Sequence, residues 1–344
     1  MNIGIITFHW ATNYGAVLQS YALQEALRHL GHNVCIINYK PTRYDDTLWA
    51  FVRYRKFMSF AKYLKVRTKE HRLSSFRNKY LILTKRFRSQ HDLESIGNQF
   101  DTMITGSDQV LNKSFLVNGE SGGSTAYFLG FGPDCIIRFA YAASFGSTDY
   151  PQKLIEQVKP LISRFSAVSA RENTGLAIFK AMGAKYPVLV PDPTLLHTSD
   201  FYDKLLLGEV AIERRVRAYF LRGRECTVSD HLDRLDVEMI TDQSVEQWIN
   251  AIKFSSHFIT NSFHGVVFCL LFHVPFTVVL ESKDNIGMND RFYTLLDSLS
   301  LTKRIFTERE FNSFAVDSIF DWDEIDKRLN AQRKIGLDFL RQIK

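Results

Sequence analysis

The chain contains the stretch Ile259-Thr260-Asn261-Ser262-Phe263-His264-Gly265, followed directly by Val266-Val267-Phe268-Cys269-Leu270-Leu271-Phe272. The apolar residues before Asn261 predict a short strand, and those after Gly265 predict a buried helix. His264 and Gly265 therefore stand at a helix start outside the carboxyl end of a strand, where open α/β sheets bind ligands. A helix start suits an anion, and a histidine exchanges a proton near neutral pH. The alternative, a histidine that only caps its own helix, stays open on this stretch alone.

The same alternation of strand and helix runs along the whole chain of 344 residues. It begins with a strand over Ile3–Phe8, a helix over Ala16–Leu30 and a strand over Val34–Asn38, an order that favours a parallel sheet. Further strands are predicted over residues 102–105, 136–143, 167–170, 188–190, 218–221, 237–241, 257–260 and 276–280. Length and pattern together predict two doubly wound, Rossmann-like α/β domains that face a cleft.

The predicted domain boundaries follow this pattern. We expect an N-terminal α/β domain over residues 1–150, a C-terminal α/β domain over 151–320, and a terminal helix over 321–344 that crosses back to the first domain. The terminal helix has apolar residues at helical spacing, with Gly336 as a weak point inside it.

Positive charge is concentrated in one block of the sequence. Residues 43–94 hold 14 Lys and Arg against 5 Asp and Glu, whereas the net charge of the whole chain is +6. We interpret residues 43–95 as an insertion in the first domain, with a helix over Trp49–Arg67. Three interpretations fit its interleaved aromatic and basic residues: a lobe packed on the domain, a contact with an anionic membrane, and a nucleic-acid contact. No recognition motif accompanies the charge, so we expect no nucleic-acid partner.

The cysteine pattern argues against a metal site and against a disulfide framework. No CxxC pair occurs among the four cysteines, Cys35, Cys135, Cys226 and Cys269. Asp321-Trp322-Asp323 is interpreted as acidic capping of the terminal helix and not as a metal motif. The sequence has no signal-peptide or membrane-spanning pattern, and we expect a cytoplasmic protein.

Two strand ends in the first half carry polar residues. Asn13-Tyr14-Gly15 follow the first strand, and Gly106-Ser107-Asp108-Gln109 follow the strand over 102–105. Backbone N–H groups there suit an anion or a sugar, and an aspartate suits a base or a partner for a sugar hydroxyl. The alternatives are ordinary helix caps by Asn13, Ser107 or Asp108.

Arginines mark further candidate positions. Arg171-Glu172 ends the strand over 167–170, and a guanidinium there suits a carboxylate or phosphate, although a surface pair with Glu172 is the alternative. Asp192 stands between two prolines, either in the cleft or in a structural turn. Arg291 at a helix start is a second candidate for an anion site, whereas we expect Arg304 to face solvent.

Taken in order, these motifs resemble the polysaccharide pyruvyl transferase family. The resemblance is carried by residues 13–19, 106–109, 169–172, 191–196 and 260–265, and it covers about residues 1–300 apart from the basic insertion. It implies a fold similar to the GT-B glycosyltransferase type. It also implies transfer of a carboxyethylidene group from phosphoenolpyruvate to a sugar, which forms a pyruvate ketal and releases phosphate.

The resemblance also implies roles for residues. Family members serve the synthesis of bacterial capsule, exopolysaccharide and cell-wall polymers, and they need no metal or bound cofactor. We expect His264 to be the acid or proton shuttle, Arg171 to hold the donor's carboxylate or phosphate, and Asp108 to act on the acceptor. Further substrate contacts are expected from Asn13, Tyr14, Gly15, Ser107, Gln109, Glu172, Asp192, Asn261, Ser262, Gly265 and Arg291.

One position departs from the family pattern. Many members carry an arginine two residues before the histidine, and here that residue is Ser262. If phosphoenolpyruvate is the donor, Arg171 or Arg291 must supply the missing charge. The departure keeps two alternatives open, a GT-B-type glycosyltransferase that uses a nucleotide sugar and a non-catalytic cell-envelope binding protein. As acceptor we expect a hexose such as galactose, in a surface polysaccharide or its lipid-linked precursor, with residues 43–95 against an anionic membrane.

Overall fold

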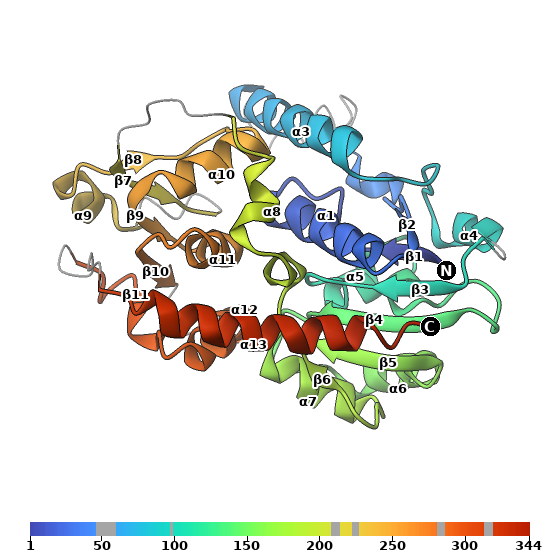
Figure 1. The fold of residues 1–344 in the computed structure, drawn as a ribbon. Coiled ribbons are helices and arrows are strands. Elements are labelled where there is room, and N and C mark those ends of the chain that lie inside the picture. Colours follow the sequence, from blue (N-terminus) through green and yellow to red (C-terminus); the bar gives the residue numbers. More distant parts are fainter. Residues whose placement is uncertain (46–59, 97–98, 208–213, 222–226, 281–285, 313–318) are drawn as a thin grey trace. The chain divides into compact units, whose positions relative to one another are not determined.

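The computed structural model describes residues 1–45, 60–96, 99–207, 214–221, 227–280, 286–312 and 319–344 (Figure 1). The chain divides into two compact units, the first made of Met1–Leu196 and Lys334–Lys344 and the second of His197–Arg333. Each unit is an α/β domain with its own parallel sheet, which confirms the predicted fold class. None of the helices in the described ranges combines the length and the apolar character that a membrane crossing requires.

The first unit is built on a six-stranded sheet with the strand order β2-β1-β3-β4-β5-β6. All neighbouring strands are parallel, and the central strands are buried, as expected of a parallel sheet with helices on its faces. The strands are β1 (Asn2–Ile6), β2 (Asn33–Ile36), β3 (Thr102–Thr105), β4 (Ile137–Ala143), β5 (Phe165–Ala170) and β6 (Val188–Leu189).

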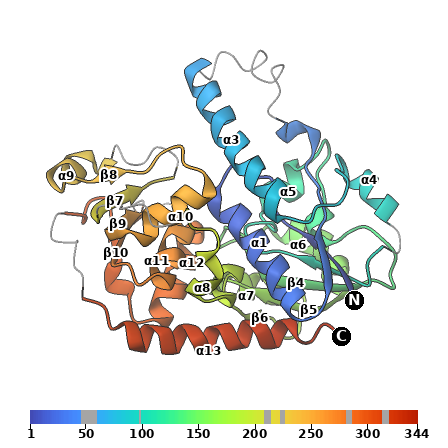
Figure 2. The ribbon, with the colours of Figure 1, turned by 45° about the horizontal axis from the view of Figure 1, so that its top comes forward.

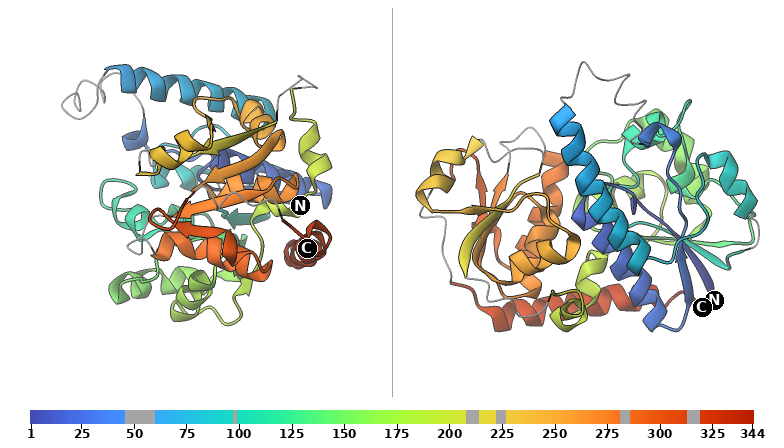
Figure 3. Two further views of the ribbon diagram at one scale, coloured as in Figure 1. Left: turned by 90° about the vertical axis from the view of Figure 1, so that its left-hand side faces the viewer. Right: turned by 90° about the horizontal axis from the view of Figure 1, so that it is seen from above.

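Helices cover both faces of this first sheet. One face carries α1 (Tyr14–His29) and the C-terminal end of α13 (Trp322–Leu340), and the other carries α6 (Gln152–Ile162) and α7 (Asn173–Ala181), as the left view of Figure 3 shows. Two short helices, α4 (Gln90–Leu93) and α5 (Lys113–Asn118), lie in the connections that flank β3. The apolar core therefore forms on both sides of the sheet.

The second unit has a five-stranded parallel sheet with the order β11-β10-β9-β7-β8. Its strands are β7 (Arg215–Tyr219), β8 (Glu238–Met239), β9 (Ser255–Thr260), β10 (Phe276–Leu280) and β11 (Ile305–Thr307). Its helices are α8 (Ser199–Asp203), α9 (Ser229–Arg234), α10 (Val245–Lys253), α11 (Phe263–Leu271) and α12 (Ile286–Ser298). The sequence pattern misses β11, because three residues are too few to show a period.

Each sheet has one point at which the strand order reverses. In the first sheet the chain passes from β1 outward to β2 and then resumes on the opposite side of β1 with β3. In the second sheet the corresponding pair is β7 and β9. Open α/β sheets bind ligands at such switch points, outside the carboxyl ends of the strands. The loops after β1, β3, β7 and β9 are therefore where a site is expected.

The first unit ends later than the sequence predicts. The predicted boundary is at residue 150, but β5 and β6 pair with β4 and extend the first sheet, so that this unit continues to Leu196. Strand patterns alone do not show which sheet a strand joins, because parallel pairing depends on contacts between distant segments. The helix α13 belongs to the second unit up to Arg333 and to the first unit from Lys334 onward.

The basic insertion contains a helix that runs further than predicted. The predicted helix Trp49–Arg67 begins outside the described residues, and the described helix α3 continues from Phe60 to Tyr80. Its second half packs on α1, where the ring of Tyr21 lies 5.8 Å from that of Phe76 and 5.6 Å from that of Tyr80. These aromatic residues at helical spacing explain the extension.

Arg304 is buried and does not face solvent, contrary to the prediction. Its guanidinium donates to the carbonyl oxygen of Ile319 and lies 4.1 Å from the centroid of the Phe320 ring. A desolvated cation over an aromatic face is favourable. The sequence around Arg304 does not reveal the ring, because Phe320 is brought in by folding.

Gly336 marks a close approach and not a weak point of α13. A Cβ atom there would lie 2.6 Å from the hydroxyl oxygen of Tyr141 and 2.7 Å from a methyl carbon of Leu196. Tyr141 cannot move away easily, because it is buried and its hydroxyl donates to the carbonyl oxygen of Pro191 at 3.1 Å. One turn further on, the Phe339 ring packs 6.0 Å from the Tyr141 ring.

We predict that Gly336→Ala lowers the free energy of unfolding by about 1–3 kcal/mol, because the overpacking outweighs the better helix propensity of alanine. Urea unfolding followed by circular dichroism measures the change. Lys334→Ala, at an exposed position of the same helix, should stay within about 0.5 kcal/mol of the wild type. A Gly336→Ala variant as stable as the wild type would contradict the close packing.

Candidate active site

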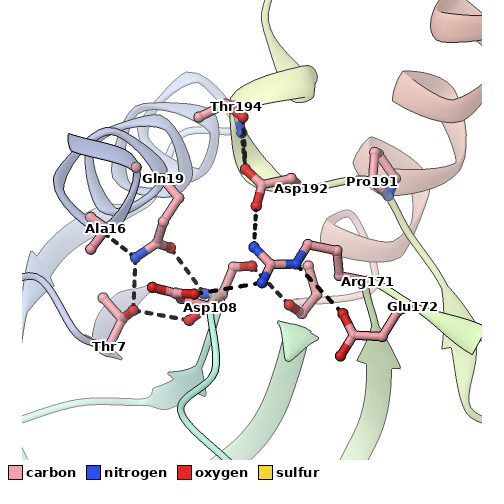
Figure 4. A network of polar contacts seen from close by, with 12 residues as sticks. Thr7, Ala16, Gln19, Asp108, Arg171, Glu172, Pro191, Asp192 and Thr194 are labelled. Carbon is pink, nitrogen blue, oxygen red and sulfur yellow. Dashed lines mark hydrogen bonds and ion pairs between the residues drawn. The ribbon is translucent and has the colours of Figure 1, made fainter. Parts of the chain in front are cut away.

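Gln19 joins the two loops at the switch point of the first unit (Figure 4). Its side-chain nitrogen donates to the Thr7 hydroxyl at 2.9 Å and to the Ala16 carbonyl oxygen at 2.9 Å, and its oxygen accepts from the Ser107 N–H at 3.1 Å. The Thr7 hydroxyl donates in turn to the Ser107 carbonyl oxygen at 3.0 Å. This buried network fixes the end of β1, the start of α1 and the end of β3 relative to one another.

The loop after β3 passes tightly over β4. Gly106 has a φ of +113°, and a Cβ atom there would lie 2.2 Å from the carbonyl oxygen of Tyr141, so only glycine fits. Asp108, two residues later, has a φ of +69° and its carbonyl oxygen accepts from the Ser144 N–H at 3.0 Å. The side chain of Asp108 remains 18% exposed. The glycine thus lets the loop present Asp108 at the carboxyl edge of the sheet.

Arg171 stands at the centre of three carboxylates (Figure 4). Its guanidinium donates to Asp192 at 2.8 Å and lies 3.5 Å from a carboxylate oxygen of Asp108 and 3.6 Å from one of Glu172. Its side chain is only 2% exposed. Asp192 also accepts from the N–H and the hydroxyl of Thr194, at 3.0 and 2.7 Å. One arginine therefore holds the loops that follow β3, β5 and β6.

The electrostatics of this cluster favour a positioning role for Arg171. Burial alone would lower the pKa of its guanidinium, but the three carboxylates, Asp192 first, raise that pKa above its ordinary value. In the described part of the chain, three carboxylates lie around this one guanidinium. The arrangement suits Arg171 to orient Asp108, and its hold on a donor's carboxylate or phosphate stays a prediction.

The predicted residues of the first unit fall into two groups. The side chains of Tyr14, Ser107, Glu172 and Asp192 are almost completely buried and support the site from within. Accessible side chains are those of Asn13, Asp108 and Gln109. Asn13 also caps α1, because its side-chain oxygen accepts from the Gly15 N–H at 2.8 Å.

Gln109 carries a polar atom without a partner. Its side-chain nitrogen is buried and has no hydrogen-bond partner among the described residues. The Thr105 hydroxyl, at the end of β3, is likewise buried without a hydrogen-bond partner among the described residues. Buried donors are normally satisfied, so a donor at a ligand-binding edge that lacks a partner is a candidate contact for a substrate oxygen. The substrate contact of Gln109 stays a prediction.

His9 is a residue of this edge that the sequence interpretation missed. Its two ring nitrogens lie 3.1 Å from the Thr7 carbonyl oxygen and 3.1 Å from the Asn38 side-chain oxygen. Burial is the main cause that lowers its pKa from 6.5 to about 4, against the effect of the two hydrogen bonds. Thr7, His9 and Gln19 share one signal, a buried polar residue within or shortly after an apolar segment, which marks a buried hydrogen-bond network.

In the second unit, the predicted stretch forms a capped helix start. The Ser262 hydroxyl caps α11 by accepting from the Gly265 N–H at 3.2 Å, and the Ser262 N–H donates to the Thr260 hydroxyl at 2.9 Å. His264 is the second residue of α11 and is 5% exposed. The helix start directs partial positive charge toward this point. Ser262, where an arginine is common in the family pattern, therefore has a capping function here.

Arg291 is the sixth residue of α12 and not at a helix start, contrary to the prediction, but it lies beside the start of α11. Its guanidinium carbon is 5.6 Å from the centroid of the Phe263 ring and 5.5 Å from that of Phe292. The Phe263 ring in turn packs edge-on against the His264 ring, with centroids 5.5 Å apart. Of the two arginines predicted to replace the charge missing at Ser262, the second unit thus provides Arg291 near His264.

Asn261 connects the two loops at the switch point of the second sheet. Its side-chain oxygen accepts from the Leu221 N–H at 2.7 Å, and its nitrogen donates to the Leu221 carbonyl oxygen at 3.3 Å. Leu221 follows β7 and Asn261 follows β9, so these bonds hold together the strand ends where a ligand is expected. His257 and His273 lie elsewhere, in contact with Thr277 and Asp326 respectively.

Comparison with known proteins gives one match to a family. A family model described as polysaccharide pyruvyl transferase matches residues 13–283, a range that contains the motifs of both units. No curated protein matches the chain.

Several solved structures are similar in fold. UDP-GlcNAc 2-epimerase from Neisseria meningitidis, bound to UDP-GlcNAc, is 7% identical, with 98% of this chain and 94% of that chain covered and a TM-score of 0.47. MnaA of S. aureus, in a co-structure with UDP, is 12% identical, with 96% and 90% covered and a TM-score of 0.49. The glycosyltransferase SsfS6 from Streptomyces sp. SF2575 is 13% identical, with 100% and 99% covered and a TM-score of 0.44.

We predict that Arg171→Met lowers the free energy of unfolding by about 3–5 kcal/mol, because it leaves three buried or half-buried carboxylates without their cation. Urea unfolding at pH 7 measures the loss. The matched control is Arg164→Met, which breaks a pair with the 93% exposed carboxylate of Asp134 and should cost about 1 kcal/mol or less. Equal losses in the two variants would contradict the central position of Arg171.

We predict that His9 makes the protein less stable as the pH falls from about 6.5 to about 4. In this window the unfolded histidine binds a proton and the folded one does not, so acid favours the unfolded state. Between pH 7 and pH 4.5 the contribution is about 2–3 kcal/mol. His9→Gln should lose this part of the pH dependence in urea unfolding, whereas the exposed-site variant His91→Gln should keep it. Parallel pH profiles for His9→Gln and wild type would disprove the assignment.

Proposed function

The chain belongs to the polysaccharide pyruvyl transferase family, and on that premise we propose that it transfers a carboxyethylidene group from phosphoenolpyruvate to two hydroxyls of a sugar. The family match over residues 13–283 is the observation that carries this proposal. The product is a cyclic pyruvate ketal, and phosphate is released. We propose a hexose such as galactose as the acceptor, in a bacterial surface polysaccharide or its lipid-linked precursor.

The reaction needs an acid, a base and a group that holds an anion. A proton is added to the methylene carbon of the donor, which becomes the methyl group, while the first sugar oxygen bonds to the neighbouring carbon. The C–O bond to phosphate then breaks, and the second sugar oxygen closes the ketal. The sugar loses two hydroxyl protons. In the overall balance, the new methyl group gains one proton and the released phosphate gains the other. Acid–base groups and preorganised charge accelerate such steps.

The second unit offers groups suited to the anionic donor. We assign the donor's carboxylate or phosphate to the start of α11 together with Arg291, and the proton transfer to His264. The dipole of α11 and the guanidinium of Arg291 both favour negative charge at this place. In this assignment Arg291 supplies the charge that Ser262 lacks.

The first unit offers groups suited to a sugar. We assign Asp108 as the base that accepts a hydroxyl proton, and Asn13 and Gln109 as contacts to the sugar. Arg171 is assigned as a positioning residue, since it orients Asp108 from a buried place. The carboxylate of Asp108 suits a neutral hydroxyl better than an anionic donor. This assignment gives the acceptor to the first unit and the donor to the second.

The cellular setting is part of the proposal. A lipid-linked acceptor would lie at the inner membrane face, so we propose that the enzyme acts there, in the cytoplasm. We also propose that it needs no metal or bound cofactor. The exposed side of the insertion helix α3 carries Arg67 and Lys79, which suit an anionic lipid surface. If α3 contacts the membrane, reversing the charges of Arg67 and Lys79 must abolish binding of the protein to anionic vesicles.

We predict that the purified protein releases phosphate from phosphoenolpyruvate only when a galactose-containing acceptor is present, with the ketal seen as added mass in mass spectrometry. His264→Ala should lower kcat by about 10²–10⁴-fold or more, because proton transfer to carbon loses its acid. The control His91→Ala, at an exposed site, should keep full activity. A fully active His264→Ala enzyme would exclude the assigned acid.

A different binding result would redirect the assignment. Ligands that bind the folded state raise its thermal stability, so phosphoenolpyruvate should protect the protein from unfolding. Protection by nucleotide sugars alone would favour a nucleotide-sugar glycosyltransferase.

A further inference from the structure

The inner side of the insertion helix α3 contacts the loop that follows β1. Lys69, Glu70 and Arg77 of α3 all reach residues of the segment His9–Tyr14, and Figure 2 shows α3 above α1 in the first unit. This segment stands at the switch point of the first sheet and contains Asn13. The insertion, which lies outside the motifs that carry the family resemblance, thus reaches the proposed sugar side of the site.

The contacts of Glu70 and Arg77 form one connected set. One carboxylate oxygen of Glu70 accepts from the Thr12 hydroxyl at 2.9 Å, and the other accepts from Ser74 and from Arg77. Arg77 also donates to the carbonyl oxygen of His9 at 3.4 Å. The side chains of Arg77 and Glu70 are only 7% and 16% exposed, so the pair is shielded from solvent. One ion pair therefore holds the loop at two points, His9 and Thr12.

Lys69 adds a third contact at the end of the loop. Its ammonium nitrogen lies 4.8 Å from the centroid of the Tyr14 ring, over the first residue of α1. A cation at this distance from an aromatic face is favourable, and more so when water is excluded. The loop is thus touched at His9, Thr12 and Tyr14, and Asn13 lies between the last two.

Attachment of α3 to the domain does not require these charges. The rings of Phe76 and Tyr80 pack against Tyr21, and the Gln24 side chain donates to the Tyr80 carbonyl oxygen at 3.0 Å and accepts from the Ile82 N–H at 2.8 Å. A shielded ion pair gains little net stability, because desolvation offsets its attraction. What the pair adds is a defined geometry for the loop to which it is bonded.

We propose that Glu70 and Arg77 are positioning residues for the saccharide acceptor. They act through Thr12 and the His9 carbonyl group and set the place of Asn13 at the carboxyl edge of the first sheet. The insertion is then an acceptor-specificity element, and not only a basic surface. This inference rests on the proposed function for the identity of the acceptor, but the ordering of the loop can be measured without turnover.

The test compares Glu70→Gln with His71→Gln, the neighbouring exposed position on the same helix. Hydrogen–deuterium exchange of the peptide that covers residues 9–14 is measured first, without substrate. We expect about tenfold faster exchange in Glu70→Gln, because a hydrogen bond to a charged group is lost, and wild-type exchange in His71→Gln. Thr12→Val removes the hydroxyl donor from the other side of the same hydrogen bond and should also give about tenfold faster exchange. This variant serves as the test if Glu70→Gln folds poorly.

Kinetics provide the second readout, with β-1,4-galactobiose as the acceptor probe. Glu70→Gln should raise the KM for galactobiose about tenfold and leave the KM for phosphoenolpyruvate unchanged. Unchanged loop exchange overturns the proposal, and so does faster exchange with an unchanged acceptor KM. A wild-type protein without pyruvyl transfer would count against the proposed function alone, and the exchange comparison would then decide whether the pair orders the loop.

Discussion

The buried guanidinium of Arg171 is the interaction on which the first unit's site depends. Three loops end at this one cation, each with a carboxylate that would be costly to bury alone. Because Asp192 also accepts from Thr194, the position of one loop is coupled to the start of the next turn. The guanidinium of Arg171 thus ties together three loops of the chain itself. Of the three carboxylates around it, that of Asp108 remains accessible.

The two units connect the loops at their switch points in the same way. In both, a side-chain amide connects the loops at the switch point of a parallel sheet, Gln19 in the first unit and Asn261 in the second. Both switch points face a helix start, α1 in the first unit and α11 in the second, and the second unit adds His264 and Arg291. The carboxylates around Arg171 lie along the same edge of the first sheet.

Local sequence patterns predicted most of the secondary structure, and physical reasons explain the exceptions. The strand over Thr102–Thr105 and the start of α11 follow from apolar runs that end in polar caps, signals carried within a few residues. The same signals placed Arg171 and Asp108 at strand ends. They did not show that the two side chains meet, since Arg171 carries equal charge whether it faces a ligand, solvent or a carboxylate. His9 and Arg304 were missed or misplaced for the same reason, because their partners come from distant segments.

The sequence by itself determined that this chain forms two parallel-sheet α/β domains, belongs to a family of transferases, and presents polar residues at the carboxyl ends of its strands. These properties depend on hydrophobic period, caps and motif order, which are local. Only the tertiary structure decided that the first sheet takes in β5 and β6, that α3 reaches the loop after β1, and that Arg171 is enclosed by carboxylates. Each of these is a contact between residues far apart in the chain, and such contacts are selected by packing and charge pairing in the folded state.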